Sequence, residues 1–296
     1  MKRLLLPVLG MLVLAACGGG SEPETAQVET TMCDRACLTG LLDQYVNAIV
    51  AQDPSALPVT ADVRFTEDSQ DLKLGEGLWE TKLTKGAFRQ DYIDTTAQIA
   101  AMHVQLLGEE EQFLYAVVLH TADGKINGIE TLVDRITPES RFQPTMLGEP
   151  LVGMNDPVPA GEKESRADAI QTALKYTEGL RIGTFIDTTP FADEAYRIEN
   201  GSYMAGPTGC PREECPDIQT QDIITHPDVQ ASVAAVDEEK GIVLLWMNFG
   251  FTDSYGPGNA LVTFEAFKVW GGQIHVVNAF FRILPMDTQR GWPSAD

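Results

Sequence analysis

Gly272–Leu284 reads GQIHVVNAFFRIL, and Gly124–Ile136 reads GKINGIETLVDRI. Each segment follows a glycine-containing turn and continues as a mostly apolar run, which is typical of a β-strand that closes a hairpin. The two segments begin about 150 residues apart, and self-similarity at that spacing indicates duplicated domains, because the repeats of a solenoid are much shorter. The chain is therefore predicted to hold two copies of one domain.

An amphipathic helix is predicted before the strands of each copy. LTGLLDQYVNAIVAQD, at Leu38–Asp53, and RADAIQTALKYTEGLRIGTF, at Arg166–Phe185, both place apolar residues at steps of three and four. Each helix leads through a loop into a short strand, and longer strands follow. Helices that come first and antiparallel hairpins that come afterwards indicate the α+β class.

Composition predicts the boundaries between these parts. Residues 18–31 read GGGSEPETAQVETT, which is typical of a flexible tether. The first domain is expected to span residues 32–145 and the second domain residues 165–296. Residues 146–164, rich in proline and glycine, are predicted to link them.

The first seventeen residues are interpreted as an export signal. A basic start precedes an apolar run, Leu4–Ala16, that is too short to span a bilayer as a helix. Two alanines stand directly before Cys17, which resembles the site at which bacterial lipoproteins receive acyl chains such as palmitate. Gly18 follows, which by the same resemblance favours the outer membrane. Residues 1–17 are thus predicted to be a lipoprotein signal peptide with lipidated Cys17, anchored to the outer membrane and facing the periplasm of a Gram-negative bacterium.

The four other cysteines form two local couples, Cys33 with Cys37 and Cys210 with Cys215. A zinc site usually needs closer couples and reduced thiolates, whereas an even number of cysteines in an exported chain favours disulfides. We predict disulfides within each couple. The sequence leaves pairing between the couples open.

Charge and missing motifs exclude several classes of function. The formal net charge is −22, from 43 Asp and Glu against 21 Lys and Arg. Such a chain would repel phosphate backbones, so no nucleic-acid partner is expected, and the acidity is interpreted as a source of solubility. The phosphate-binding loop, the dinucleotide fingerprint, the His-Glu-x-x-His motif and the Gly-x-Ser-x-Gly elbow are all missing from the sequence. No cofactor and no metal are therefore predicted.

The order of a helix, a loop, a short strand and long strands resembles the nuclear transport factor 2-like, or SnoaL-like, cone fold. Three segments, CDRACL at 33–38, RFTED with LGEGLW within 64–79, and RIENG at 197–201, resemble an exported bacterial and fungal family of uncharacterised function with two such domains. The resemblance extends from about Met32 to Trp292. It implies a curved, mostly antiparallel sheet wrapped around helices, with an apolar pocket at its open end.

Two histidines are the candidate catalytic residues. His275 stands where the aligned first-copy strand has Asn127, and His226 lies in a loop beside a proline. Because an imidazole titrates near neutral pH, either could act as a general acid or base. The sequence does not fix the strand phase, so the pocket could face either Asn278 and its alternate neighbours or the set that contains His275.

Other polar and aromatic residues are candidate ligand contacts. Trp246 and Asn248 alternate on one strand and so share one face, where they would suit an aromatic or carbohydrate-like ligand. Asn200 is expected in a turn that tolerates positive φ, with its amide free to bond backbone or ligand. Tyr203 is expected to pack the ligand, and Asn278 is added as a further amide. Arg64 with Glu67, and Arg197 with Glu199, are predicted as structural ion pairs at corresponding places in the two copies.

Two functions fit these residues. The first is a cofactor-independent lyase, dehydratase or isomerase that acts on a small apolar or aromatic molecule in the second domain. In it, His275 or His226 would move the proton and Asn248 would hold a carbonyl or hydroxyl group. The second is a non-catalytic ligand-binding or assembly lipoprotein of the cell envelope, whose surfaces could serve self-association into a homo-oligomer. The sequence does not decide between them.

Overall fold

The computed structural model describes residues 32–140, 142–147 and 151–296. The predicted signal peptide, the tether and Cys17 lie outside these residues. Within them, no helix is both long and apolar enough to cross a membrane. All of them belong to one compact unit.

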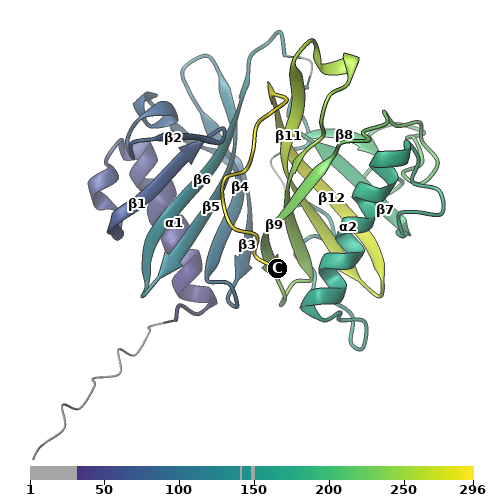
Figure 1. The fold of residues 1–296 in the computed structure, drawn as a ribbon, viewed down its shortest axis with the longest axis horizontal. Coiled ribbons are helices and arrows are strands. Elements are labelled where there is room, and N and C mark those ends of the chain that lie inside the picture. The colour runs from purple at the N-terminus through teal and green to yellow at the C-terminus, as the bar shows by residue number, and fades with distance from the viewer. Residues whose placement is uncertain (1–31, 141, 148–150) are drawn as a thin grey trace, which may run out of the picture. The chain divides into compact units, whose positions relative to one another are not determined.

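Each half of the chain consists of one long helix followed by six strands (Figure 1). The first half contains α1 (Arg35–Ala51), β1 (Val59–Glu67), β2 (Gln70–Leu72), β3 (Thr84–Asp94), β4 (Ile99–Leu107), β5 (Gln112–Ala122) and β6 (Lys125–Ile136). The second half contains α2 (Arg166–Ile182), β7 (Phe191–Glu199), β8 (Ser202–Ala205), β9 (Gln230–Asp237), β10 (Ile242–Asn248), β11 (Asn259–Trp270) and β12 (Gln273–Pro285). Single turns of 3-10 helix occur at Pro54–Ala56, Gly77–Glu80 and Asp253–Tyr255.

The two sheets have the same topology. Their strand orders are β2-β1-β6-β5-β4-β3 and β8-β7-β12-β11-β10-β9. The β1–β6 and β7–β12 pairs are parallel, and the other pairs are antiparallel. Register shifts interrupt both sheets, and such bulges bend strands so that a sheet can curve around its helix. The predicted tandem α+β duplication is confirmed.

Capping residues fix where both helices begin. The Asp34 side chain accepts a hydrogen bond from the backbone N–H of Cys37, and the Ser165 side chain accepts one from Asp168. A left-handed Gly183 ends α2. Cys33 is bonded to Cys37, and Cys210 to Cys215, which is the pairing expected from the sequence.

The strands are apolar on both faces because each face packs against a different partner. On β5, Tyr115 and Val117 pack against α1 inside the first half, whereas Leu114 and Ala116 belong to a second core that contains residues of both halves. This two-sided burial explains why strands read as continuous apolar runs rather than alternating ones.

Matching turns give a residue-by-residue correspondence between the halves. The β1–β2 turn places Asp68 and Ser69 at positive φ, and the β7–β8 turn does the same with Asn200 and Gly201. Glu67 and Glu199 therefore correspond, and because they lie beside Thr131 and Ala279, those two residues correspond as well.

This correspondence corrects one prediction. Arg197 occupies the place of Phe65, and Arg64 occupies the place of Tyr196, so the two arginines are one register position apart and face opposite sides of their sheets. Arg64 pairs with Asp71, not with Glu67. The Arg197–Glu199 pair is present, with the charged atoms 3.0 Å apart.

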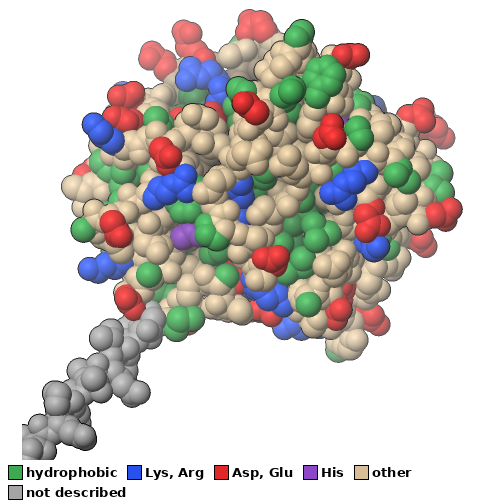
Figure 2. Space-filling view, viewed as in Figure 1, with side chains coloured by type: hydrophobic (Ala, Val, Ile, Leu, Met, Phe, Trp, Pro, Cys, Tyr) green, Lys and Arg blue, Asp and Glu red, His purple; other side chains and the backbone are tan. Residues whose placement is uncertain are grey.

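Charged residues are spread over the surface. Figure 2 shows Asp and Glu side chains scattered over the visible face, with Lys and Arg between them. No single patch on this face gathers one sign of charge. This distribution fits the interpretation of the acidity as a source of solubility.

Candidate functional site

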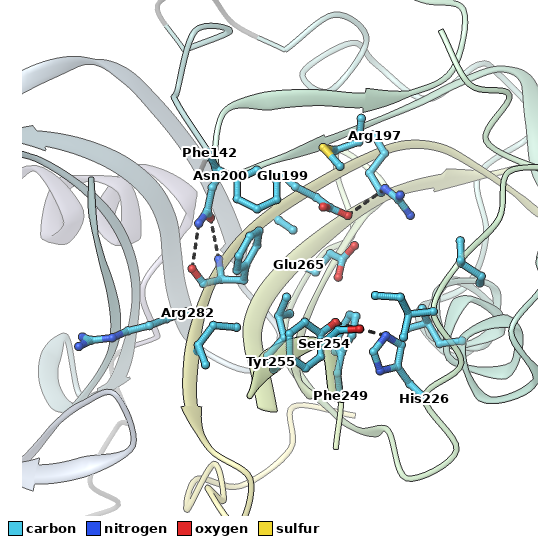
Figure 3. Close-up of a pocket in the computed structure, with 18 of the residues that line it drawn as sticks. Phe142, Arg197, Glu199, Asn200, His226, Phe249, Ser254, Tyr255, Glu265 and Arg282 are labelled. Carbon is cyan, nitrogen blue, oxygen red and sulfur yellow. Dashed lines mark hydrogen bonds and ion pairs between the residues drawn. The ribbon is translucent and has the colours of Figure 1, made fainter. Parts of the chain in front are cut away.

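A cavity of about 650 Å³ opens inside the second half (Figure 3). Helix α2, strands β7, β8, β11 and β12, and the segments before β9 and before β11 all contribute to its wall. The first half adds the end of β6 and the residues after it. Its lining includes Asp134, Ile136, Phe142, Tyr176, Arg197, Glu199, Asn200, Met204, Gln221, His226, Phe249, Tyr255, Leu261, Glu265, Ala279, Phe281, Arg282 and Ile283.

The cavity exists because smaller or polar residues replace the bulky ones that fill the first half. Along β5, Phe113, Tyr115 and Val117 point into the first-half core, and their counterparts on β11 are Leu261, Thr263 and Glu265. The loss of two aromatic rings leaves space that neighbouring side chains do not refill.

A tryptophan side chain also helps to fill the core of the first half. Trp79, from the short segment between β2 and β3, packs edge-on against Tyr45 with ring centroids 5.5 Å apart. Tyr176 is the counterpart of Tyr45, since both are the eleventh residue of their helix. In the second half, the segment between β8 and β9 is longer than the segment between β2 and β3. It forms one wall of the cavity and does not fill the interior.

Glu265 is the central polar group of the cavity. Its side chain is 1% exposed, and its Oε1 atom has no hydrogen-bond partner among the described residues. Burial raises the pKa of Glu265 to about 8, the charge of Glu199 adds to the rise, and Arg197 and Tyr176 oppose it. Near neutral pH this carboxyl therefore holds its proton.

Arg197 lies beside Glu265 with its charge compensated. Its Nη1 atom donates to the Tyr176 hydroxyl at 3.0 Å, its Nη2 atom donates to Gln221 at 3.0 Å, and its Nε atom lies 3.0 Å from Glu199. These partners fix the guanidinium in place. A buried ion pair needs such additional hydrogen bonds to offset the cost of removing its charges from water.

His226 and Tyr255 form the opposite side of the cavity. The His226 Nε2 atom lies 3.3 Å from the Tyr255 hydroxyl, and the two rings are stacked. The backbone N–H of His226 donates to Leu180 on α2, which places the ring at the cavity wall. Burial lowers the pKa of His226 to about 4, so its imidazole is neutral at pH 7. In Figure 3 the Glu265 carboxyl lies between this pair and the Arg197–Glu199 pair.

Asn200 joins the two halves at the cavity. Its side-chain amide donates to Asp134 at 2.7 Å and to the Phe281 carbonyl at 3.0 Å, and it accepts from the Phe281 N–H at 2.8 Å. Burial raises the pKa of Asp134 to about 6. Because Asp134 belongs to β6, one acidic group of this site comes from the first half.

Of the seven residues predicted to act in catalysis or ligand binding, His226 and Asn200 line the cavity, and the other five lie elsewhere. The His275 ring stacks on Trp270, and its Nδ1 atom lies 2.6 Å from Glu194. The Tyr203 hydroxyl lies within hydrogen-bond distance of two backbone carbonyls of the following loop, at 2.7 and 2.9 Å.

The remaining three predicted residues face away from the cavity. Trp246 is buried in the core that both halves share. Asn248 donates to the carbonyls of Met286 and Thr288. Asn278 bonds His103 of the first half at 2.9 Å. On β12 it is Ala279 and Phe281 that line the cavity, so the strand phase places Asn278 on the opposite face.

Sequence reasoning missed Glu265, Tyr176, Tyr255 and Asp134 as site residues, and it interpreted Arg197 and Glu199 mainly as a structural ion pair whose carboxylate could alternatively serve as a base. Glu265 could have been identified from the sequence. Glu265 is an acidic residue within the apolar run ALVTFEAFKVW, whereas the corresponding run FLYAVVLH has Val117. A charge inside a buried strand needs an explanation, and function is one.

Comparisons with known proteins extend over parts of the chain. Residues 162–281 match a family described as a domain of unknown function, DUF8021. No curated protein matches the chain. A solved NTF2-like protein of unknown function from Cytophaga hutchinsonii is similar at 9% identity and a TM-score of 0.28, covering 36% of this chain and 94% of its own. A putative ketosteroid isomerase from Kribbella flavida is similar at 14% identity and a TM-score of 0.29, covering 41% of this chain and 94% of its own.

Proposed function

We propose that the second half binds a small, largely apolar molecule in its cavity and moves protons on it without a cofactor, with Glu265 as the acid and His226 as the base. One observation carries this proposal. A buried carboxyl with an unpartnered oxygen faces an open cavity at the position where the packed first half has valine.

A structural role alone does not explain Glu265. Burying a carboxyl group costs several kcal/mol unless it is paired and fully hydrogen-bonded. Val117 demonstrates that an apolar residue fits the same place in the same fold. A residue that costs stability and faces a cavity is a candidate for chemistry.

The two proposed groups hold opposite protonation states. Near pH 7 Glu265 carries a proton to donate, and the His226 imidazole is neutral, so that it can accept one. His226 would take a proton from a carbon next to a carbonyl group, and Glu265 would give its proton to the carbonyl oxygen, which yields an enol. If the enol is conjugated with a second double bond, return of the proton from His226 to a different carbon completes an isomerisation. Transfer of that proton to a neighbouring hydroxyl, which leaves as water, completes a dehydration. In both cases Glu265 regains its proton from the enol oxygen.

The rest of the cavity suits an apolar body. Met204, Phe249, Leu261, Phe281 and Ile283 line it, and pockets of this kind bind mainly through apolar contact with a few polar groups fixing the orientation. We also propose, from the sequence alone, that the protein is exported and anchored through Cys17, so that its ligand would be found in the cell envelope.

Proton exchange tests the proposed chemistry directly. With 2-tetralone as the probe in D2O, we expect the protein to catalyse deuterium incorporation next to the carbonyl, followed by mass spectrometry. Glu265→Gln and His226→Asn should each slow exchange by about 100-fold or more. The controls Glu67→Gln, a carboxyl in the packed half at the place that corresponds to Glu199, and His275→Asn, outside the cavity, should exchange at the rate of the unmodified protein.

Two outcomes would decide against this proposal. Exchange that survives Glu265→Gln unchanged would remove Glu265 from the mechanism. Binding of 2-tetralone without catalysed exchange would replace the enzymatic function with non-catalytic ligand binding, the rival that the sequence left open.

A further inference from the structure

We propose that Asp134 of the first half is a second ligand-binding residue of this cavity, and that it selects molecules with a hydroxyl group at the end remote from Glu265. This inference rests on the proposed function, because it concerns the same cavity. It gives the first half a direct part in recognition.

The position of Asp134 is fixed by a neighbouring residue of the cavity wall, Asn200. The Asn200 amide donates to its Oδ2 atom at 2.7 Å, and Asn200 is itself held by both backbone groups of Phe281. An ionised carboxylate can accept several hydrogen bonds through its two oxygens. The Asn200 contact therefore leaves Asp134 with capacity to accept a hydrogen bond from a ligand.

A comparison of Asp134 with its counterpart Arg282 explains why the second half has open space beside Asp134. Asp134 corresponds to Arg282, and Asn200 corresponds to Asp68. Arg282 reaches across to the first half, where it pairs with Asp68 and donates to the Val133 carbonyl at 3.0 Å. The long Arg282 side chain thus covers Asp68 in the first half. At the corresponding place in the second half, the shorter Asp134 side chain leaves space for a ligand and an oxygen that can accept a hydrogen bond from it.

Asp134 and Glu265 line the same cavity, so that one ligand can contact both. Glu265 is directly opposite Ala279, and Phe281, which Asn200 holds, is two residues further along the same face of β12. Two residues of strand advance about 7 Å, which a fused bicyclic ring can span. Figure 3 shows Asn200 on one side of Glu265, and Arg197 and His226 on the other.

The proposed ligand therefore has three parts. A carbonyl group meets Glu265, an apolar ring system lies along Ala279 and Phe281, and a hydroxyl group donates to Asp134. Hydrogen bonds to a charged acceptor are stronger than neutral ones, so the hydroxyl should strengthen binding by about tenfold.

A matched pair of probes tests this selection. We expect the unmodified protein to bind 6-hydroxy-2-tetralone about tenfold more tightly than 6-methoxy-2-tetralone, measured by calorimetry. Asp134→Asn and Asp134→Ala should abolish the preference and leave the affinity for the methoxy compound unchanged. Asp62→Asn, the same chemical change on an exposed position of β1, should retain the preference.

The outcomes separate this inference from the function on which it rests. Asp134 is not a selecting residue if the tetralones bind but Asp134→Asn still prefers the hydroxy compound over the methoxy compound. The same conclusion follows if the unmodified protein binds both compounds equally well. If Asp134→Asn still exchanges deuterium into 2-tetralone, the catalytic proposal stands in either case. If no tetralone binds to any variant, both proposals are contradicted.

Discussion

At the scale of single residues, the second half differs from the first by a few substitutions that convert a packed core into a cavity. Val117 is replaced by Glu265, Phe65 by Arg197 and Tyr115 by Thr263. The new charged groups are largely paired, but one Glu265 oxygen is not. A buried carboxyl with an unpartnered oxygen, such as Glu265, should lower the stability of the protein and is retained where activity needs it.

We predict that Glu265→Gln stabilises the protein in a pH-dependent way. Because the pKa of Glu265 is raised from its usual 4.5 to about 8, the folded state keeps a proton that the unfolded chain loses between these values. The stability of the unmodified protein should therefore fall as pH rises through this window, and glutamine removes that loss. Chemical denaturation should give equal stabilities at pH 4.5 and a variant more stable by on the order of a few kcal/mol at pH 8.

Glu178→Gln, an exposed change on α2, is the control and should alter stability little at either pH. A difference between Glu265→Gln and the unmodified protein that stays constant from pH 4.5 to pH 8 would show that Glu265 is not held neutral by burial.

Residue-level prediction from the sequence succeeded where the local pattern carries the information. The Asn200 turn was predicted, because Asn and Gly accept positive φ. The phase of β12 was not predictable, because both of its faces are buried and the usual alternation is lost. That ambiguity is why Asn278 and His275, which belong to the two alternative phases of this strand, were both predicted as site residues.

At the scale of elements, the connection between β8 and β9 distinguishes the halves most clearly. Residues 206–229 contain the Cys210–Cys215 disulfide and supply Gln221 and His226 to the cavity. The corresponding first-half segment is shorter and contributes Trp79 to the core. A disulfide in a segment without helix or strand restricts the conformations that its neighbours can adopt.

We predict that the double variant Cys210→Ser, Cys215→Ser binds 2-tetralone several-fold more weakly, because the wall that carries His226 becomes less ordered. The unfolding free energy should fall by only about 2 kcal/mol, since the closed loop is short. Calorimetry gives the affinity, and chemical denaturation gives the stability. Cys33→Ser with Cys37→Ser is the matched control, because that disulfide lies at the start of α1. It should cost similar stability without weakening binding, and equal weakening by both pairs would contradict the prediction.

The helices, the strands and their duplicated order were accessible to sequence reasoning, because apolar spacing and the repeat at Gly124 and Gly272 record them. The path of residues 206–229 was not. Irregular segments carry no periodicity, so the meeting of His226 with Tyr255, from a different loop, follows only from tertiary packing.

At the scale of the whole chain, the two halves contact each other as the subunits of a two-fold dimer do. The Asp94 side chain accepts from the Val236 N–H at 2.8 Å, and the Asp237 side chain accepts from the Ile93 N–H at 3.1 Å. Each contact is a copy of the other with the halves exchanged, which is the property of an isologous interface.

The first residue of each helix completes this reciprocal arrangement. Arg35 of α1 pairs with Asp237 of the second half, and Arg166 of α2 pairs with Asp94 of the first half. Both aspartates are fully buried. The C-terminal segment adds a contact that is not duplicated, since Arg290 pairs with buried Glu130 at 2.9 Å.

We predict that Asp94→Ala and Asp237→Ala destabilise the protein by similar amounts, about 3 kcal/mol each, because each change removes the partner of an arginine and of a buried backbone N–H. Asp71→Ala, which breaks the exposed pair with Arg64, should cost less than about 1 kcal/mol. Chemical denaturation measures all three. If the halves depend on this interface, the two buried variants should also unfold in two separate transitions, whereas the unmodified protein and Asp71→Ala unfold in one. A single shared transition in every variant would mean that the common core alone couples the halves.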